Sequence, residues 1–139
     1  MIEYVYKTNY SIKEETKYTE WFNKIITSES KSAGDLVFIL TDDEEILKVN
    51  QDYLSHDYFT DIITFEYNTN DEVSGDVFIS LDRIKENAKT YKVTFEEELR
   101  RVMVHGVLHL LGYNDKTEKE KAEMRSLENQ NLKMFHVEQ

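Results

Sequence analysis

Hydrophobic residues along the chain follow two different periods, and the changes between them mark the expected elements. Short runs that are apolar or alternate in polarity predict strands at Ile2–Lys7, Leu36–Leu40, Asp61–Tyr67 and Asp76–Ser80. Between these runs, apolar residues recur every three or four positions, which is typical of helices that bury one face. The second run is apolar throughout, which indicates a strand covered on both faces.

Pairs of capping residues predict where the helices begin. A Ser or Thr followed three positions later by Glu can satisfy backbone N–H groups that have no partner at a helix start. Four such pairs predict four helices, and the apolar period that follows Ser80 predicts a fifth. The pairs are Ser11 with Glu14, Thr41 with Glu44, Thr94 with Glu97, and Thr117 with Glu120.

The order of these elements predicts an α/β fold. The first three strands are joined through helices, which favours parallel crossovers, whereas Asn68 to Gly75 is a hairpin-length loop between the third and fourth. We therefore expect a mixed four-stranded sheet with helices packed on it. Neither a repeat nor a linker is present, so residues 1–139 are expected to form a single domain.

Composition narrows the class of protein. With 40% apolar and 12% aromatic residues, the chain resembles ordinary globular proteins. Its apolar runs are too short to span a membrane, and its first residues lack the pattern of a signal peptide, so we expect a cytoplasmic protein with no membrane partner. The absence of cysteine excludes disulfides, thiolate catalysis and sulfur-ligated metals.

The net charge of −11 is unevenly distributed. Residues 1–82 carry 6 basic and 18 acidic side chains, whereas residues 83–139 carry 11 basic and 10 acidic ones. An acidic surface repels phosphate, so any anionic ligand is expected to approach the second half of the chain.

One stretch in this second half carries the candidate chemistry. It should be helical as far as Leu111, which places His105 and His109 about 40° apart around the helix and about 6 Å apart along it. Gly112 then supplies a left-handed residue that brings Asp115 back toward the histidines. Two histidines at this spacing fit a structural role equally well when taken alone. Because apolar residues surround the pair, we expect a central, metal-binding helix, with three protein ligands and open positions for catalysis.

The ligand types bear on which metal is bound and which reaction it supports. Two imidazoles and a carboxylate suit Zn²⁺, our first expectation, but also accept Ni, Mn or Fe. Gly106 stands where a zinc-peptidase helix of the His-Glu-x-x-His kind has its general base, which makes peptide hydrolysis the weaker assignment. For a hydrolase of peptides or small esters, Glu66 or a water held by Asp61 would have to act as the base.

The stretch from His105 through Tyr113 resembles the YbeY-type endoribonucleases, ribosomal-RNA maturation factors that carry a zinc ion. Their signature is His-Gly-x-Leu-His-Leu-x-Gly-Tyr-Asp-His, in which all three histidines are taken as metal ligands. In this chain Asn114 and Asp115 replace the final Asp-His pair. A carboxylate therefore occupies the position of the third imidazole, which affects metal identity and affinity.

Two upstream segments extend the resemblance. Asn50–Phe65 is similar to the family's Leu-Asn-x-x-Tyr-Arg-x-x-Asp-x-x-Thr-Asp-Val-Leu-Ser-Phe segment, and Gly75–Ser80 to its Gly-Asp-Ile-x-Ile-Ser segment. Leu54 replaces an Arg regarded as functionally important in the family. That replacement removes a bidentate phosphate contact, which Leu cannot supply.

The resemblance implies a metal-dependent endoribonuclease that acts on single-stranded RNA, with His105 as a catalytic residue. Ribosomal-RNA precursors would be the target, in rRNA maturation and ribosome quality control, and the ribosome or ribosomal proteins would be partners. An acidic protein that handles RNA needs a local basic strip, although the same residues also fit solvated helix faces. The candidates are Arg83, Lys85, Lys89, Lys92, Arg100 and Arg101.

Other polar residues have two interpretations. Thr60, Asp61 and Thr64 either hydrogen-bond to the metal ligands from outside or form an ordinary turn at a strand entry. His56 either helps to bind phosphate or is solvated, and His136 has no assigned role. A non-catalytic ribosome-assembly or RNA-binding factor with a structural metal is the alternative that Leu54 favours.

Overall fold

The elements of the computed structural model follow the expected order of strands and helices. It describes residues 1–54 and 60–137. In chain order the elements are β1 (Ile2–Tyr6), α1 (Glu15–Ser28), β2 (Ser32–Thr41), α2 (Asp43–Leu54), β3 (Ile62–Glu66), β4 (Glu72–Ser80), α3 (Leu81–Tyr91), α4 (Phe95–Leu110) and α5 (Glu118–Val137).

The strands form a mixed four-stranded sheet in the order β1-β2-β4-β3, as predicted. β2 pairs in parallel with both β1 and β4, and β3 pairs antiparallel with β4 through the expected hairpin. The expected parallel crossover from the second to the third strand is wrong. β4 takes the place beside β2, and β3 lies at the edge, running opposite to β2.

Three of the expected helix starts are confirmed. Ser80 accepts a hydrogen bond from the Arg83 N–H at 3.2 Å, and Thr94 accepts one from Glu97 at 3.1 Å. At the third, the Thr117 N–H donates to the Glu120 carboxylate at 3.0 Å, and the Glu120 N–H donates back to the Thr117 hydroxyl at 3.1 Å.

The other two expected starts are wrong. α1 begins four residues after Ser11, and the residue that precedes it, Glu14, makes no capping bond through its side chain. Thr41 pairs within the sheet as the last residue of β2. The carboxylate of Asp42 instead accepts from the Glu45 N–H at 2.9 Å, so α2 starts one residue later than its hydroxyl pattern predicts.

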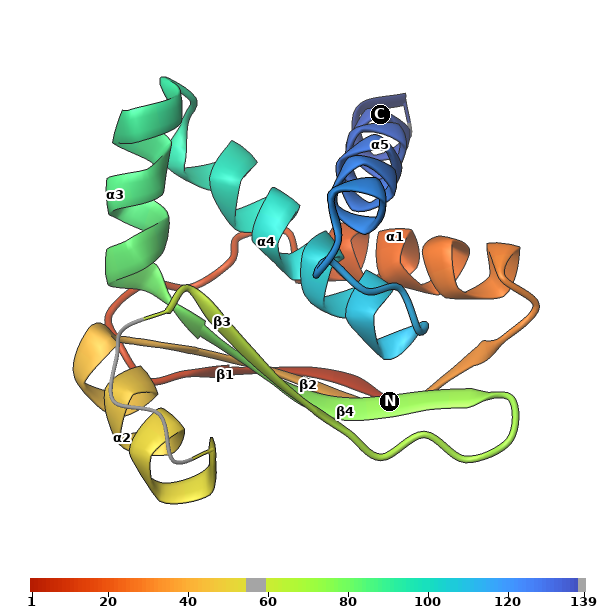
Figure 1. Cartoon of the computed structure of the whole chain (residues 1–139), viewed down its shortest axis with the longest axis horizontal. Coiled ribbons are helices and arrows are strands. Elements are labelled where there is room, and N and C mark those ends of the chain that lie inside the picture. Colours follow the sequence, from red (N-terminus) through yellow and green to blue (C-terminus); the bar gives the residue numbers. More distant parts are fainter. Residues whose placement is uncertain (55–59, 138–139) are drawn as a thin grey trace.

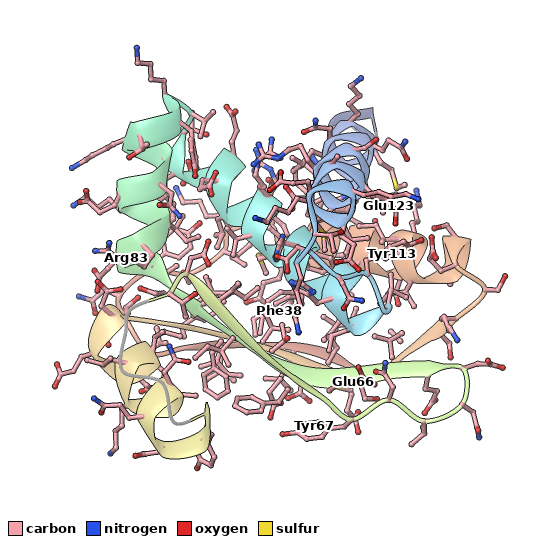
Figure 2. All side chains as sticks on the ribbon, viewed as in Figure 1. Phe38, Glu66, Tyr67, Arg83, Tyr113 and Glu123 are labelled. Carbon is pink, nitrogen blue, oxygen red and sulfur yellow. The ribbon has the colours of Figure 1, made fainter. Side chains whose placement is uncertain are left out.

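Helices cover both faces of the sheet unequally. α1, α3, α4 and α5 lie on one side and α2 lies on the other (Figure 1). The main core lies on the first side, where Phe38 points from the sheet toward the helices and stacks on Phe22 at 4.8 Å between ring centroids (Figure 2). A smaller cluster, formed by Ile46 and Val49 of α2 and Ile63 of β3, lies on the other side.

α4 is the central helix, as predicted, and it packs closely on the sheet at Gly106. A Cβ atom there would lie 2.8 Å from Ile62 Cδ1 and 3.0 Å from Val77 Cγ1. The absence of a side chain therefore lets the helix backbone approach β3 and β4, which fixes the position of the neighbouring His105 over the sheet.

Within the described part of the chain, none of the helices is long and apolar enough to cross a membrane.

Candidate metal centre

The chain reverses sharply where α4 ends, and this turn carries the third candidate ligand. Gly112 has a φ of +105°, a left-handed conformation that favours glycine. Its N–H donates to the His109 carbonyl at 3.0 Å, and the Tyr113 N–H donates to the Leu108 carbonyl at 3.0 Å. These two bonds satisfy the last helix carbonyls and direct the following residues, including Asp115, back along α4.

The three predicted ligands converge on one point. His105 Nε2 lies 2.9 Å from His109 Nε2 and 3.2 Å from Asp115 Oδ2, and the third separation, from His109 Nε2 to Asp115 Oδ2, is 3.5 Å. Atoms that bind one tetrahedral ion at about 2.1 Å lie roughly 3.4 Å from one another. The donor set and its spacing therefore fit a metal ion, and the group could hold one.

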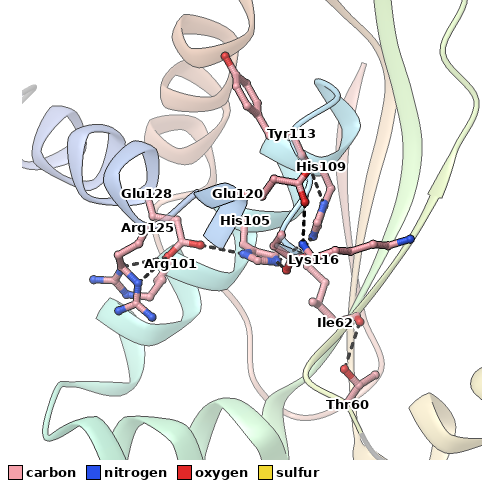
Figure 3. Close-up of polar contacts among 11 residues, drawn as sticks. Thr60, Ile62, Arg101, His105, His109, Tyr113, Lys116, Glu120, Arg125 and Glu128 are labelled. Atoms are coloured by element: carbon pink, nitrogen blue, oxygen red, sulfur yellow. Dashed lines mark hydrogen bonds and ion pairs between the residues drawn. The ribbon is translucent and has the colours of Figure 1, made fainter. Parts of the chain in front are cut away.

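The other ring nitrogen of each histidine is also engaged (Figure 3). His105 Nδ1 donates to Glu128 Oε2 at 2.8 Å, and His109 Nδ1 donates to the Tyr113 carbonyl at 2.9 Å. A proton fixed on Nδ1 leaves the Nε2 lone pair free to face an ion, which is how metal-binding histidines are oriented in proteins. The turn after α4 thus both delivers Asp115 and orients His109.

Sequence reasoning missed Glu128, which lies in α5 and is 4% exposed. Its carboxylate accepts from Arg101 Nη1 at 3.0 Å and lies 3.8 Å from Arg125 Nε. A signal was available, because Glu128 occupies a position on the buried stripe of its helix, between Met124 and Asn131. A charged residue on such a stripe needs partners, and here they are the Arg101 guanidinium and the His105 imidazole.

The pKa of His105 reflects opposing influences. Burial lowers it, but the hydrogen bond and negative charge of Glu128, together with the charges of Asp115 and Asp61, outweigh burial and raise it above the ordinary value. For Asp61, burial is the largest influence and raises the pKa of the carboxyl, although the charge of His105 opposes it. The centre is therefore rich in negative charge, as a cation site should be.

A cleft of about 370 Å³ opens beside the centre, between α3, α4 and α5. His105, Asp115 and Asp61 line one end of it. Farther along the same face of α4 lies Glu98, which is only 3% exposed. Burial is the largest influence on this carboxyl and raises its pKa to about 7, despite the opposing charge of Arg101.

Asp61, Thr60 and Thr64, the candidates for hydrogen bonds to the metal ligands, lie in three different surroundings. Asp61 lines the cleft, and its charge acts on His105. The Thr60 hydroxyl donates to the Ile62 carbonyl at 3.5 Å, a contact within the strand entry. Thr64 lies under Gly106, with its methyl group 3.7 Å from the position of a Cβ there.

The basic candidates do not form one strip. Arg101 lines the cleft, but Arg83 binds the Asp43 carboxylate at 3.0 Å and so joins α3 to α2. The Arg100 guanidinium lies over the Phe135 ring at 4.6 Å from its centroid. Lys85, Lys89 and Lys92 are exposed and do not line the cleft. Two cations of α5 that sequence reasoning missed, Lys121 and Arg125, do line it.

Three sequence predictions fall outside what the structure describes. His56 lies outside the described residues, and the side chains of Leu54 and His136 are not described. The roles expected for His56 and for the replacement at Leu54 stay predictions, and His136 has none assigned.

This fold and this site define a class: an α/β protein whose central helix offers two imidazoles and a nearby carboxylate to a metal ion beside a cleft. A family model described as Endoribonuclease YbeY matches residues 3–136 of the chain. The chain belongs to the YbeY family of endoribonucleases, as its signature segments predict.

Individual relatives are similar to this chain over nearly its whole length. A protein of Flavobacterium psychrophilum named Endoribonuclease YbeY is 50% identical over 139 residues, covering 100% of this chain and 99% of the relative. One of the same name from Flavobacterium johnsoniae is 47% identical and covers 100% of both chains. The solution structure of TM1509 from Thermotoga maritima is similar in fold, with a TM-score of 0.70 and 29% identity over 99% of this chain and 91% of that one.

Proposed function

We propose that this protein is a metal-dependent endoribonuclease that cleaves single-stranded RNA. The observation that carries the proposal is the convergence of His105, His109 and Asp115, with both imidazoles fixed through Nδ1. Family membership supports the choice of RNA as the substrate. In this proposal the protein acts in the cytoplasm on ribosomal-RNA precursors, in their maturation and in ribosome quality control, with the ribosome or ribosomal proteins as partners.

Zn²⁺ is the proposed ion because two imidazoles and a carboxylate suit it, and Ni, Mn and Fe are the alternatives that the same ligands accept. A bound ion of this kind polarises a phosphate and lowers the pKa of a water or hydroxyl. The chain's own residues would hold the ion and orient its ligands. The Tyr113 carbonyl in the turn after α4 orients the His109 ring, and Glu128 orients the His105 ring. His105 is the proposed catalytic residue because it also lines the cleft that the substrate would enter.

The cleft carries both signs of charge, which suits a polyanion that must reach a cation centre. Arg101, Lys121 and Arg125 line it together with the carboxylates, and we propose that they contact RNA phosphates. Lys85 and Lys89 remain candidates for more distant contacts along α3.

A non-catalytic ribosome-assembly factor with a structural metal is the second candidate function. The observation that favours it is Leu54, which replaces the Arg of the family signature. A hydrolase of peptides or small esters has less support, because Gly106 stands where a zinc-peptidase helix has its general base. Of its two candidate bases, Glu66 is exposed and does not line the cleft, whereas Asp61, which would act through a water, does.

Replacing one ligand tests the proposal. His109→Ala should lose its bound metal, because two remaining ligands rarely hold a divalent ion tightly, and should lose cleavage of unstructured RNA with it. Metal content by elemental analysis and cleavage of a labelled oligonucleotide are the two measurements. Glu123→Ala, an exposed residue of α5 outside the cleft, is the matched control and should retain both properties.

The outcomes separate the candidate functions. Metal-loaded protein that binds RNA but leaves it intact would favour the assembly factor, and hydrolysis of casein without cleavage of RNA would favour the peptidase. Full metal content in His109→Ala would overturn the ligand set itself.

A further inference from the structure

The cleft beside the metal centre contains a buried carboxylate that the proposed cleavage chemistry does not use. Glu98 lines the cleft, is 3% exposed, and makes no side-chain hydrogen bond or ion pair with any other residue that the structure describes. Its oxygens are not among the fully buried polar atoms without a partner in the described residues, so their small exposed area opens on the cleft. The carboxylate is therefore arranged to receive donors from a ligand.

The shape of the cleft indicates what size of ligand it takes. At about 370 Å³ it is near the lower end of the range for small-molecule sites and too small for a folded or paired nucleic acid. His105 and Asp115 line the same cleft, so a ligand in it would adjoin the metal centre. An RNA strand passing the centre would place one flanking nucleotide there.

The rim of the cleft offers the contacts that a nucleotide needs. Tyr91, at the end of α3, lines the cleft and is 58% exposed, and an exposed aromatic ring is a surface on which a base can stack. Across from it, Lys121 and Arg125 of α5 have side chains that are 58% and 63% exposed, and each lies 3.8 Å from a carboxylate of its own helix. Such long, exposed ion pairs are weak and leave both cations able to contact phosphate. α3 and α5 stand on either side of α4 (Figure 1).

The chemistry of a carboxylate selects among the bases. An ionised carboxylate has two acceptor oxygens side by side, so it pairs best with a base edge that presents two adjacent donors. An acceptor on the base would place its lone pair against one of the oxygens. Guanine presents N1–H beside its N2 amino group. The pairing edges of adenine, cytosine and uracil place an acceptor beside each donor, so one carboxylate oxygen would be repelled.

We propose that this cleft is a subsite for one guanine nucleotide adjacent to the scissile phosphate, with Glu98 reading the base and Tyr91 stacking on it. The inference rests on the proposed endoribonuclease function and names part of its substrate. Two bonds to a buried, charged acceptor give strong discrimination between bases. The raised pKa of Glu98, about 7, agrees with an acceptor whose charge is costly until donors reach it.

Binding of mononucleotides to the zinc-supplied full chain tests the base preference. Titration calorimetry should show GMP binding at least tenfold more tightly than UMP, AMP or CMP, which carry the same phosphate. Glu98→Gln has one acceptor oxygen in place of two and should reduce this ratio to near one. Glu97→Gln, an exposed carboxylate on the same helix, is the matched control and should keep it. Tyr91→Ala should weaken all four nucleotides while preserving the preference.

Equal binding of the four nucleotides by the unaltered protein would overturn the proposal and requires no variant. A guanine preference that survives in Glu98→Gln would overturn the role of Glu98. An RNA cleavage assay distinguishes failure of the guanine subsite from failure of the proposed endoribonuclease function. Cleavage without bias toward guanine overturns only the subsite, whereas a Glu98-dependent preference for GMP without any cleavage supports the subsite and overturns the endoribonuclease.

Discussion

The two ring nitrogens of His105 face different partners. Its Nε2 faces His109 and Asp115, where an ion would lie, and its Nδ1 donates to Glu128. A ring with a free Nδ1 could rotate or exchange its tautomer, and either change would move the lone pair away from the ion. We therefore propose that Glu128 is a positioning residue for a metal ion bound at His105 Nε2.

Removing Glu128 should weaken metal binding without removing a ligand. We expect Glu128→Ala to lower Zn²⁺ affinity roughly 10- to 100-fold, and Glu128→Gln to lose less because its carbonyl oxygen still accepts a hydrogen bond. Competition with a coloured chelator measures both values, with Glu123→Ala as the control. Affinity equal to that of the unaltered protein in Glu128→Ala would mean that His105 is oriented by other contacts.

Glu98 should make stability depend on pH. Because its pKa rises from 4.5 to about 7 in the folded state, the folded chain keeps a proton that the unfolded chain has lost between these values. The contribution of Glu98 to the free energy of unfolding therefore falls as the pH rises from about 4.5 to about 7. Relative to the unaltered protein, Glu98→Gln should gain stability over this range and hold the gain above it. Urea denaturation at pH 4.5 and pH 8 checks this expectation, and a difference that does not change with pH would contradict it.

At the residue scale, the sequence predicted what is local and missed what is tertiary. Histidines four positions apart and a glycine turn are readable along the chain, so His105, His109 and Asp115 were found together. Glu128 reaches the centre, and Glu98 lines the cleft beside it, only because α4 and α5 pack against each other. Nothing along the chain distinguishes Glu98 from its exposed neighbours Glu96 and Glu97 except its place in the apolar period.

At the scale of elements, α4 depends on the close contact at Gly106. Replacing Gly106 by Val should lower the free energy of unfolding by about 1–3 kcal/mol, because branched methyl groups would overlap Val77 and Ile62. Gly106→Ala should cost less, since the Ile62 atom it meets is the end of a flexible side chain and Ala favours the helix. Thermal and urea unfolding measure the free energies of unfolding of the two variants. A Val variant as stable as the Ala variant would show that the contact is not tight.

The helix starts show why the same capping pattern predicts some helix boundaries correctly and others not. Thr94 and Thr117 precede helices that no strand competes for, and their side chains cap as the pattern predicts. Thr41 has the same pattern but belongs to β2, where pairing with Ser80 holds it in the sheet. Local hydrogen-bonding preference gives way when backbone pairing across the sheet is available.

At the scale of the whole molecule, the sequence predicted the composition of the sheet but not the order of all its strands. The hairpin between β3 and β4 follows from its short loop, and the parallel pair β1 and β2 follows from a helical crossover. Which strand of the hairpin lies beside β2 depends on pairing between distant segments. β4 buries Val73, Val77 and Ile79, and this apolar face suits the interior place that it takes.

The candidate ligands all come from residues 105–115, whereas the walls of the cleft come from segments between Asp61 and Glu128. Contacts of short sequence separation form early in folding, and distant ones must wait for longer loops to close. The three candidate ligands can therefore be brought together by one helix end and the bend after it, whereas the cleft forms only where helices distant in the sequence pack together.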